Sequence, residues 1–177
     1  NDPRLPVCSG GDVVCKANGV TINQRDDKSA FPIYVQLKWP VRDAPITIAG
    51  GVEARMIEAE AAFRASDIPG MVTKLNQART EGGVAGLPAN LTDPGNDAAR
   101  VDLIFRERAF WLFSTGHRVG DMRRLIKFYQ RPVETVFPTG DWHKGGPYGP
   151  DVNFPVPQAE ETNPNVKANN SCTDRAA

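Results

Sequence analysis

The fold is decided by the stretch RERAFWLFSTGHRVGDMRR, residues 106–124. Its first half completes a pattern of apolar residues at three- and four-residue steps, which is typical of an amphipathic helix. Gly116 supplies a stop signal, and a second pattern of the same period follows. The stretch therefore predicts a helix over 96–114 and another over 117–129.

Charged side chains in this stretch occupy positions that a packed helix normally gives to apolar residues. Arg108 lies four residues after Ile104 and four before Leu112, on or beside the apolar stripe. A charge that is buried there costs free energy unless it is paired. The helix therefore predicts a partner for Arg108.

Two interpretations fit the charged residues as a group. Asp121 lies three residues after Arg118 and three before Arg124, so ion pairs along one helix are easy to form. A catalytic constellation of acid, base and arginine is the alternative. We favour a bracing role, in which helices and loops are joined by charge-assisted hydrogen bonds, for six residues: Glu107, Arg108, His117, Arg118, Asp121 and Arg124.

An earlier pair of helices is predicted at 52–65 and 67–80. Asp67 followed by Pro69 is a typical helix start, and Gly82 ends the second pattern. A turn this short places the two helices antiparallel, as in a tetratricopeptide-like hairpin.

The remaining segments complete a mainly α fold. We expect an irregular N-terminal arm over 1–30, a short extended segment within 31–40, and no regular structure over 131–153. The predicted fold is thus helical hairpins with long ordered loops and a C-terminal extended strap. Its expected helical domain spans 31–165, and 166–177 is expected to be a mobile tail.

Composition excludes several classes of protein. The chain has 21 basic and 21 acidic residues, whereas a nucleic-acid-binding protein normally carries an excess of positive charge. No apolar run approaches the roughly 20 residues that span a bilayer, so no transmembrane segment is expected. Neither metal-ligand spacing nor a cofactor motif is present, and we expect no metal, no cofactor and no enzymatic activity.

Three cysteines allow one disulfide. Cys8 and Cys15 lie close together among Gly and Asp, where a small loop can be closed. In an oxidising compartment we expect this bridge, with Cys172 left over or pairing instead.

The loop 140–149 combines aromatic residues, a histidine and a carboxylate with several glycines. Trp142 and Tyr148 can stack on the apolar face of a sugar ring, and His143 can form hydrogen bonds with the hydroxyl groups of the sugar. The alternative is a surface loop whose aromatic rings cover the neighbouring helices.

The segment NFPVPQAEETNPN, residues 153–165, predicts the strap, because its prolines stiffen an extended chain. Three earlier segments accompany it along the chain: EARMIEAEA (53–61), LNQAR (75–79) and the stretch 106–124. Taken in chain order, the four motifs resemble the C-terminal part of SusD/RagB-like outer-membrane lipoproteins, which have similar motifs in the same order. The motif at 106–124 departs from the family pattern, because Trp111 and Thr115 occupy positions where the family usually has carboxylates.

The resemblance implies a function without covalent chemistry. A SusD-like protein captures a nutrient, here a glycan or oligosaccharide, at the outer-membrane surface or in the periplasm. It acts with a SusC-like TonB-dependent transporter. The alternative is a truncated chain that serves as an accessory structural subunit of a larger envelope or membrane complex. A glycoside hydrolase using two of Asp141, Asp151, Glu160 and Glu161 is disfavoured, because their spacing does not fix a pair.

Overall fold

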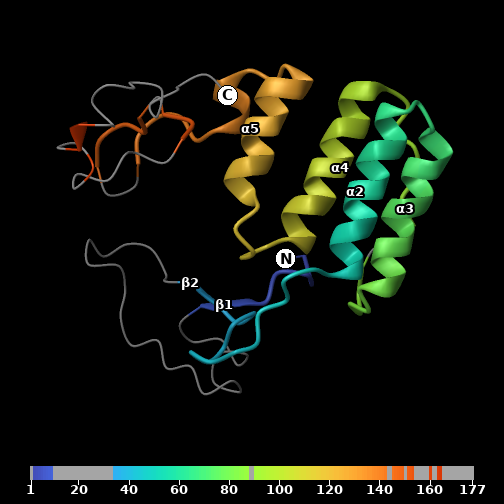
Figure 1. Ribbon diagram of the computed structural model, residues 1–177, viewed down its shortest axis with the longest axis horizontal. Helices are drawn as coiled ribbons and strands as arrows, with labels where there is room; N and C mark the ends of the chain where they lie inside the picture. Colours follow the sequence, from blue (N-terminus) through green and yellow to red (C-terminus); the bar gives the residue numbers. More distant parts are fainter. Residues whose placement is uncertain are drawn as a thin grey trace. The chain divides into compact units, whose positions relative to one another are not determined.

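The computed structural model describes residues 2–9, 34–87, 90–142, 145–149, 151–153, 160 and 163–164. Within these residues the protein is mainly helical, with five helices and a sheet of two short strands (Figure 1). The chain divides into two compact units, Asn1–Gly116 and His117–Ala177. The helical domain expected over 31–165 crosses this division.

Three helices form the core of the first unit. They are α2 (Gly51–Arg64), α3 (Ile68–Glu81) and α4 (Asp97–Trp111), and α2 packs against both others (Figure 1). The buried side chains repeat at helical spacing, as the sequence pattern predicts. They include Met56 and Ala59 of α2, Met71, Leu75 and Ala78 of α3, and Val101, Ile104 and Phe105 of α4.

Side-chain caps fix where α3 and α4 begin. The carboxylate of Asp67 accepts a hydrogen bond from the Gly70 amide at 2.9 Å, and the side chain of Asn96 accepts one from Ala99 at 2.9 Å. Each cap satisfies an amide that has no partner inside the first helical turn. The predicted starts of both helices are therefore confirmed.

The end of α4 differs from the prediction. The helix stops at Trp111 rather than at residue 114, and a turn over 112–116 follows. Ser114 and Gly116 both have positive φ, at 61° and 84°, which an α-helix cannot contain. The stop signal at Gly116 thus marks the end of a turn, because Ser114 has already left the helical conformation.

The N-terminal segment contains a strand, contrary to the irregular arm expected over 1–30. β1 (Val7–Ser9) pairs antiparallel with β2 (Tyr34–Gln36), which lies inside the extended segment predicted over 31–40. Cys8 stands opposite Val35 and is buried. A strand this short carries little periodicity of its own, so only its partner reveals it.

The second unit contains α5 (Arg118–Tyr129) and α6 (Val133–Val136). The helix predicted over 117–129 is confirmed, and Phe128, an apolar residue near its end, is 55% exposed. The irregular structure expected over 131–153 is wrong in two places, because α6 and an isolated bridge between Asp141 and Pro147 lie there. Most of the expected strap lies outside the described residues.

Candidate functional site

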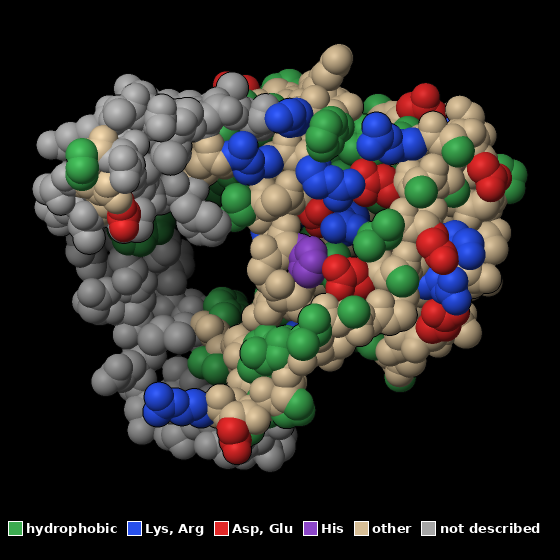
Figure 2. Space-filling view, viewed as in Figure 1, with side chains coloured by type: hydrophobic (Ala, Val, Ile, Leu, Met, Phe, Trp, Pro, Cys, Tyr) green, Lys and Arg blue, Asp and Glu red, His purple; other side chains and the backbone are tan. Residues whose placement is uncertain are grey.

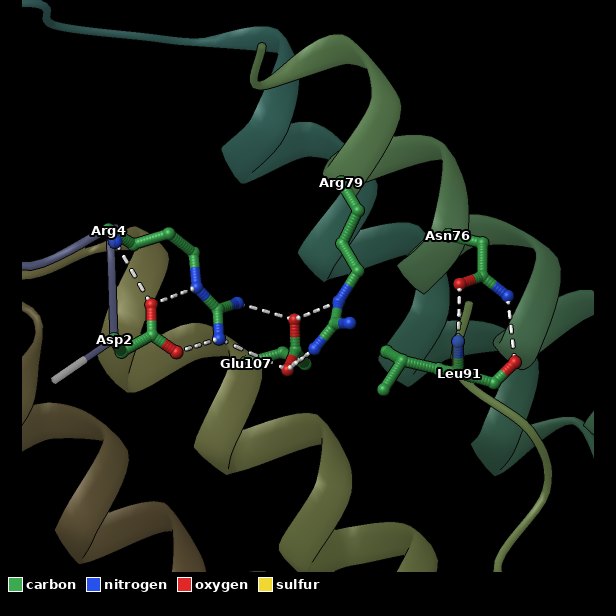
Figure 3. Close-up of polar contacts among 6 residues, drawn as sticks. All are labelled: Asp2, Arg4, Asn76, Arg79, Leu91 and Glu107. Atoms are coloured by element: carbon green, nitrogen blue, oxygen red, sulfur yellow. Dashed lines mark hydrogen bonds and ion pairs between the residues drawn. The ribbon is translucent and has the colours of Figure 1, made fainter. Parts of the chain in front are cut away.

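A buried ion cluster joins three separate segments of the first unit. The carboxylate of Glu107, from α4, is fully buried and receives two arginines (Figure 3). Arg4 donates from Nη1 to Oε2 at 2.5 Å, and Arg79 of α3 donates from Nη2 to Oε1 at 2.8 Å and from Nε to Oε2 at 3.1 Å. Charge-assisted bonds of this kind offset the cost of burying the charges.

The guanidinium group of Arg4 is enclosed on several sides. Its Nε and Nη2 donate to the two carboxylate oxygens of Asp2 at 2.8 and 2.6 Å. Its central carbon lies 4.7 Å from the ring centre of Phe110 and 5.2 Å from that of Trp111, which are cation–π distances. We call Asp2, Arg4, Arg79 and Glu107 the arginine cluster; its two carboxylates balance its two guanidinium groups.

The electrostatics of the arginine cluster keep its carboxylates charged. Burial alone would raise the pKa of Glu107, but hydrogen bonds from Arg79 and Arg4 outweigh it and hold that pKa below its ordinary value. The hydrogen bond from Arg4 likewise lowers the pKa of Asp2, against a smaller opposing effect of burial. Both acids are therefore ionised at neutral pH and act as acceptors.

A second contact fastens the loop that precedes α4. The side-chain amide of Asn76, on α3, donates to the Leu91 carbonyl at 2.9 Å and accepts from the Leu91 amide at 2.8 Å (Figure 3). A side chain that satisfies both backbone groups of one residue imitates a strand partner. Asn76 thereby fixes this loop against α3.

The turn after α4 is held by residues from the segment that follows β2. Lys38 donates from Nζ to the Phe113 carbonyl at 3.0 Å, and Trp39 donates from Nε1 to the Ser114 carbonyl at 3.0 Å. Carbonyl groups beyond the end of a helix need such donors. Burial lowers the pKa of Lys38.

The six residues expected to brace the fold have different surroundings. Glu107 is the centre of the arginine cluster, and Arg108 is buried beside it on α4. In the second unit, Arg124 and the buried Asp121 form the predicted i,i+3 pair at 3.1 Å, whereas Arg118 is exposed. His117 is the residue that immediately precedes α5.

Sequence reasoning missed Arg4 and Asp2 as parts of this site. Both lie in a polar, proline-containing segment with no periodic pattern, and no signal there indicates a buried arginine. Arg79 was available to sequence reasoning, because it lies four residues after the buried Leu75 and ends the motif LNQAR.

The loop expected to bind ligand presents its described aromatic rings to solvent. Trp142 is 41% exposed and Tyr148 is 42% exposed. The Trp142 amide donates to the Gly146 carbonyl at 2.7 Å, and the Tyr148 amide donates to the Gly140 carbonyl at 2.8 Å. Trp142 and Tyr148 are thus exposed residues on a hydrogen-bonded loop, while His143 lies outside the described residues.

The predicted disulfide and the four acidic residues considered for hydrolysis lie partly outside the described residues. Cys8 is disulfide-bonded, but Cys15 and Cys172 lie outside the described residues, so its pairing with Cys15 stays a prediction. Asp141, Asp151 and Glu160 are exposed, and Glu161 also lies outside the described part.

Two searches of the described residues found nothing. None of them form a group of three or more His, Cys, Asp or Glu side chains that could hold a metal ion. Within the same part of the chain, no helix is both long enough and apolar enough to cross a bilayer.

Comparison with protein-family models, curated proteins and solved structures gives no match.

Proposed function

We propose that this chain is the C-terminal part of a SusD-like protein that captures a glycan without chemically changing it. It passes the glycan to a SusC-like TonB-dependent transporter at the outer membrane. In this proposal α2 and α3 form a tetratricopeptide-like hairpin.

The arginine cluster supports the resemblance on which this proposal rests. The motif LNQAR provides Asn76 and Arg79, and the motif around 106–124 provides Glu107. Arg79 and Glu107 are 28 residues apart in sequence, yet their side chains form a buried ion pair at 2.8 Å. Two motifs that were recognised separately thus depend on one another physically, as parts of a packing signature should.

The single observation that carries glycan capture is the exposure of Trp142 and Tyr148 on a loop with its own hydrogen bonds. A sugar ring has an apolar C–H face that stacks on an aromatic ring, while its hydroxyl groups need polar partners. Backbone hydrogen bonds already order the positions from which the two aromatic side chains extend, so less ordering is needed on binding. This loop therefore suits a weak glycan contact made by stacking.

A glycan array compared among four proteins tests the proposal. We expect the wild-type chain to bind a subset of oligosaccharides, and Trp142→Ala and Tyr148→Ala each to weaken that binding about tenfold. Tyr34→Ala is the matched control, because Tyr34 is an exposed tyrosine at 68% that lies outside the loop. Equal binding by all four proteins, or none by the wild type, would contradict glycan capture by this loop.

One observation favours the accessory-subunit alternative. The segment between β2 and α2 exposes three apolar side chains, Val41, Ile46 and Ile48, at 59%, 73% and 96%. Exposed apolar residues that lie close together in sequence are typical of a docking segment. Ile46→Ser with Ile48→Ser should then abolish co-purification with the membrane complex, in a protein that binds no glycan.

A further inference from the structure

We infer that Glu107, together with the rings of Phe110 and Trp111, forms a receptor for a guanidinium group, which the chain fills with its own Arg4. The natural ligand is an Asp-x-Arg segment held in a turn, in which the Leu5 amide donates to the Asp2 carbonyl at 3.0 Å. Here that segment is Asp2-Pro3-Arg4, and the same site accepts an Asp-x-Arg peptide supplied by another chain.

Arg4 is bound as a ligand is bound. It lies 103 residues from Glu107 in sequence, and its guanidinium group meets a carboxylate on one side and aromatic rings at cation–π distance. The planar fork of arginine matches such a carboxylate better than the compact ammonium group of lysine does. The site therefore selects arginine over lysine.

The receptor also has contacts of its own that do not involve Arg4. Arg79 donates two hydrogen bonds to Glu107 from α3, which orients the carboxylate and leaves it paired when Arg4 departs. Phe110 and Trp111 belong to the same helix as Glu107. A site that is held in this way is preorganised, so little ordering is needed when a guanidinium group enters.

Asp2 belongs to the ligand rather than to the receptor. It lies two residues before Arg4, and three hydrogen bonds, one of them from the Arg4 amide, fold the two residues together. With Asp2 present, the incoming segment is neutral overall, and the existing pair of Arg79 and Glu107 is also neutral. An arginine that lacks this acid would add an uncompensated charge to a buried site.

Titration of a variant that lacks the internal ligand tests the inference. Arg4→Ala removes the guanidinium group, and we expect its melting temperature to rise with added methylguanidinium and with the peptide Asn-Asp-Pro-Arg-Leu-Pro, residues 1–6. Calorimetry should show the peptide binding this variant, with a dissociation constant on the order of millimolar. The wild type should bind at least tenfold more weakly, because its tethered Arg4 competes at high effective concentration.

Three controls decide the outcome. The double variant Arg4→Ala, Glu107→Gln should lose the response, methylammonium at equal ionic strength should give none, and a peptide with lysine for arginine should bind at least tenfold more weakly. If Arg4→Ala does not fold alone, the same titration is made on Arg4→Lys, which keeps a cation but not the fork. An equal response with and without Glu107, or no response in either Arg4 variant, would overturn the inference.

Discussion

Two ion networks in the same unit use the same chemistry in opposite surroundings. In the arginine cluster, the side chains of Glu107 and Arg4 are 0% and 2% exposed. On the outer surface of α2 and α3, Arg55 pairs with Glu58 at 2.8 Å and with Glu81 at 3.0 Å, with side chains that are 30–43% exposed. Figure 2 shows acidic and basic side chains interspersed over this unit.

The two networks should contribute very different amounts to the stability of the fold. The charged groups of the surface network are solvated by water and screened by salt ions. Forming each ion pair there therefore exchanges interactions with solvent for interactions of similar free energy. Water cannot replace Glu107 in the arginine cluster, because its loss would leave the buried guanidinium groups of Arg4 and Arg79 without the carboxylate that they share. We therefore expect burial, rather than the number of ion pairs, to decide the effect of each substitution.

The largest effect is expected from Glu107→Gln. This change keeps the shape but leaves two arginines facing a neutral amide, and removal of one partner from a buried pair costs about 3–5 kcal/mol. For a chain of this size, that lowers the melting temperature by roughly 10 °C in thermal unfolding. Glu81→Gln is the matched control in the surface network, and an equal loss in both variants would break the comparison.

Acid should remove the difference between wild type and Glu107→Gln. The pKa of Glu107 is lowered by folding, so its contribution is complete above the unfolded value of 4.5 and is lost as the pH falls through the folded value. Denaturant unfolding of both proteins between pH 7 and pH 3 measures this. The gap between them should stay constant down to about pH 4.5 and then narrow; a constant gap at pH 3 would show that the charge of Glu107 is not the cause.

An intermediate effect is expected from Asn76→Ala, which tests a neutral contact in the same unit. The change leaves the amide and the carbonyl of the half-buried Leu91 without their partner, at a cost of about 1–3 kcal/mol. Denaturant unfolding gives this value, with the exposed Asn90→Ala as the control. A loss as large as that of Glu107→Gln would mean that charge adds nothing to burial.

The helices of both networks follow from the sequence, but the arginine cluster does so only in part. Periodic apolar residues and the caps Asp67 and Asn96 define α3 and α4, because helix signals are local. The place of Glu107 on the packed face could be read in the same way. Its partner Arg4 could not, because a contact across 103 residues leaves no trace in local pattern or spacing.

The same limit explains the two short strands. β2 was predictable from its β-branched and aromatic residues, whereas β1 exists through its partner and the buried Cys8. The turn at Ser114 was also missed, because a serine with positive φ is uncommon and glycine at 116 offered a simpler stop. Local sequence signals therefore predicted the helices and β2, whereas β1 and the turn at Ser114 could not be predicted from such signals.

The smallest effect is expected from Arg55→Gln, which removes the centre of the surface network. Hydrogen bonds that Arg55 donates to Glu81 and Glu58 raise its pKa, yet these groups are solvated, so the shift does not translate into stability. We expect its melting temperature to equal that of the wild type in 1 M salt, where the Debye length is about 3 Å, and to differ little at low salt. A large loss that persists in 1 M salt would mean that the exposed pairs act like the buried ones. The distinction between the two networks would then lie in geometry rather than in access of water.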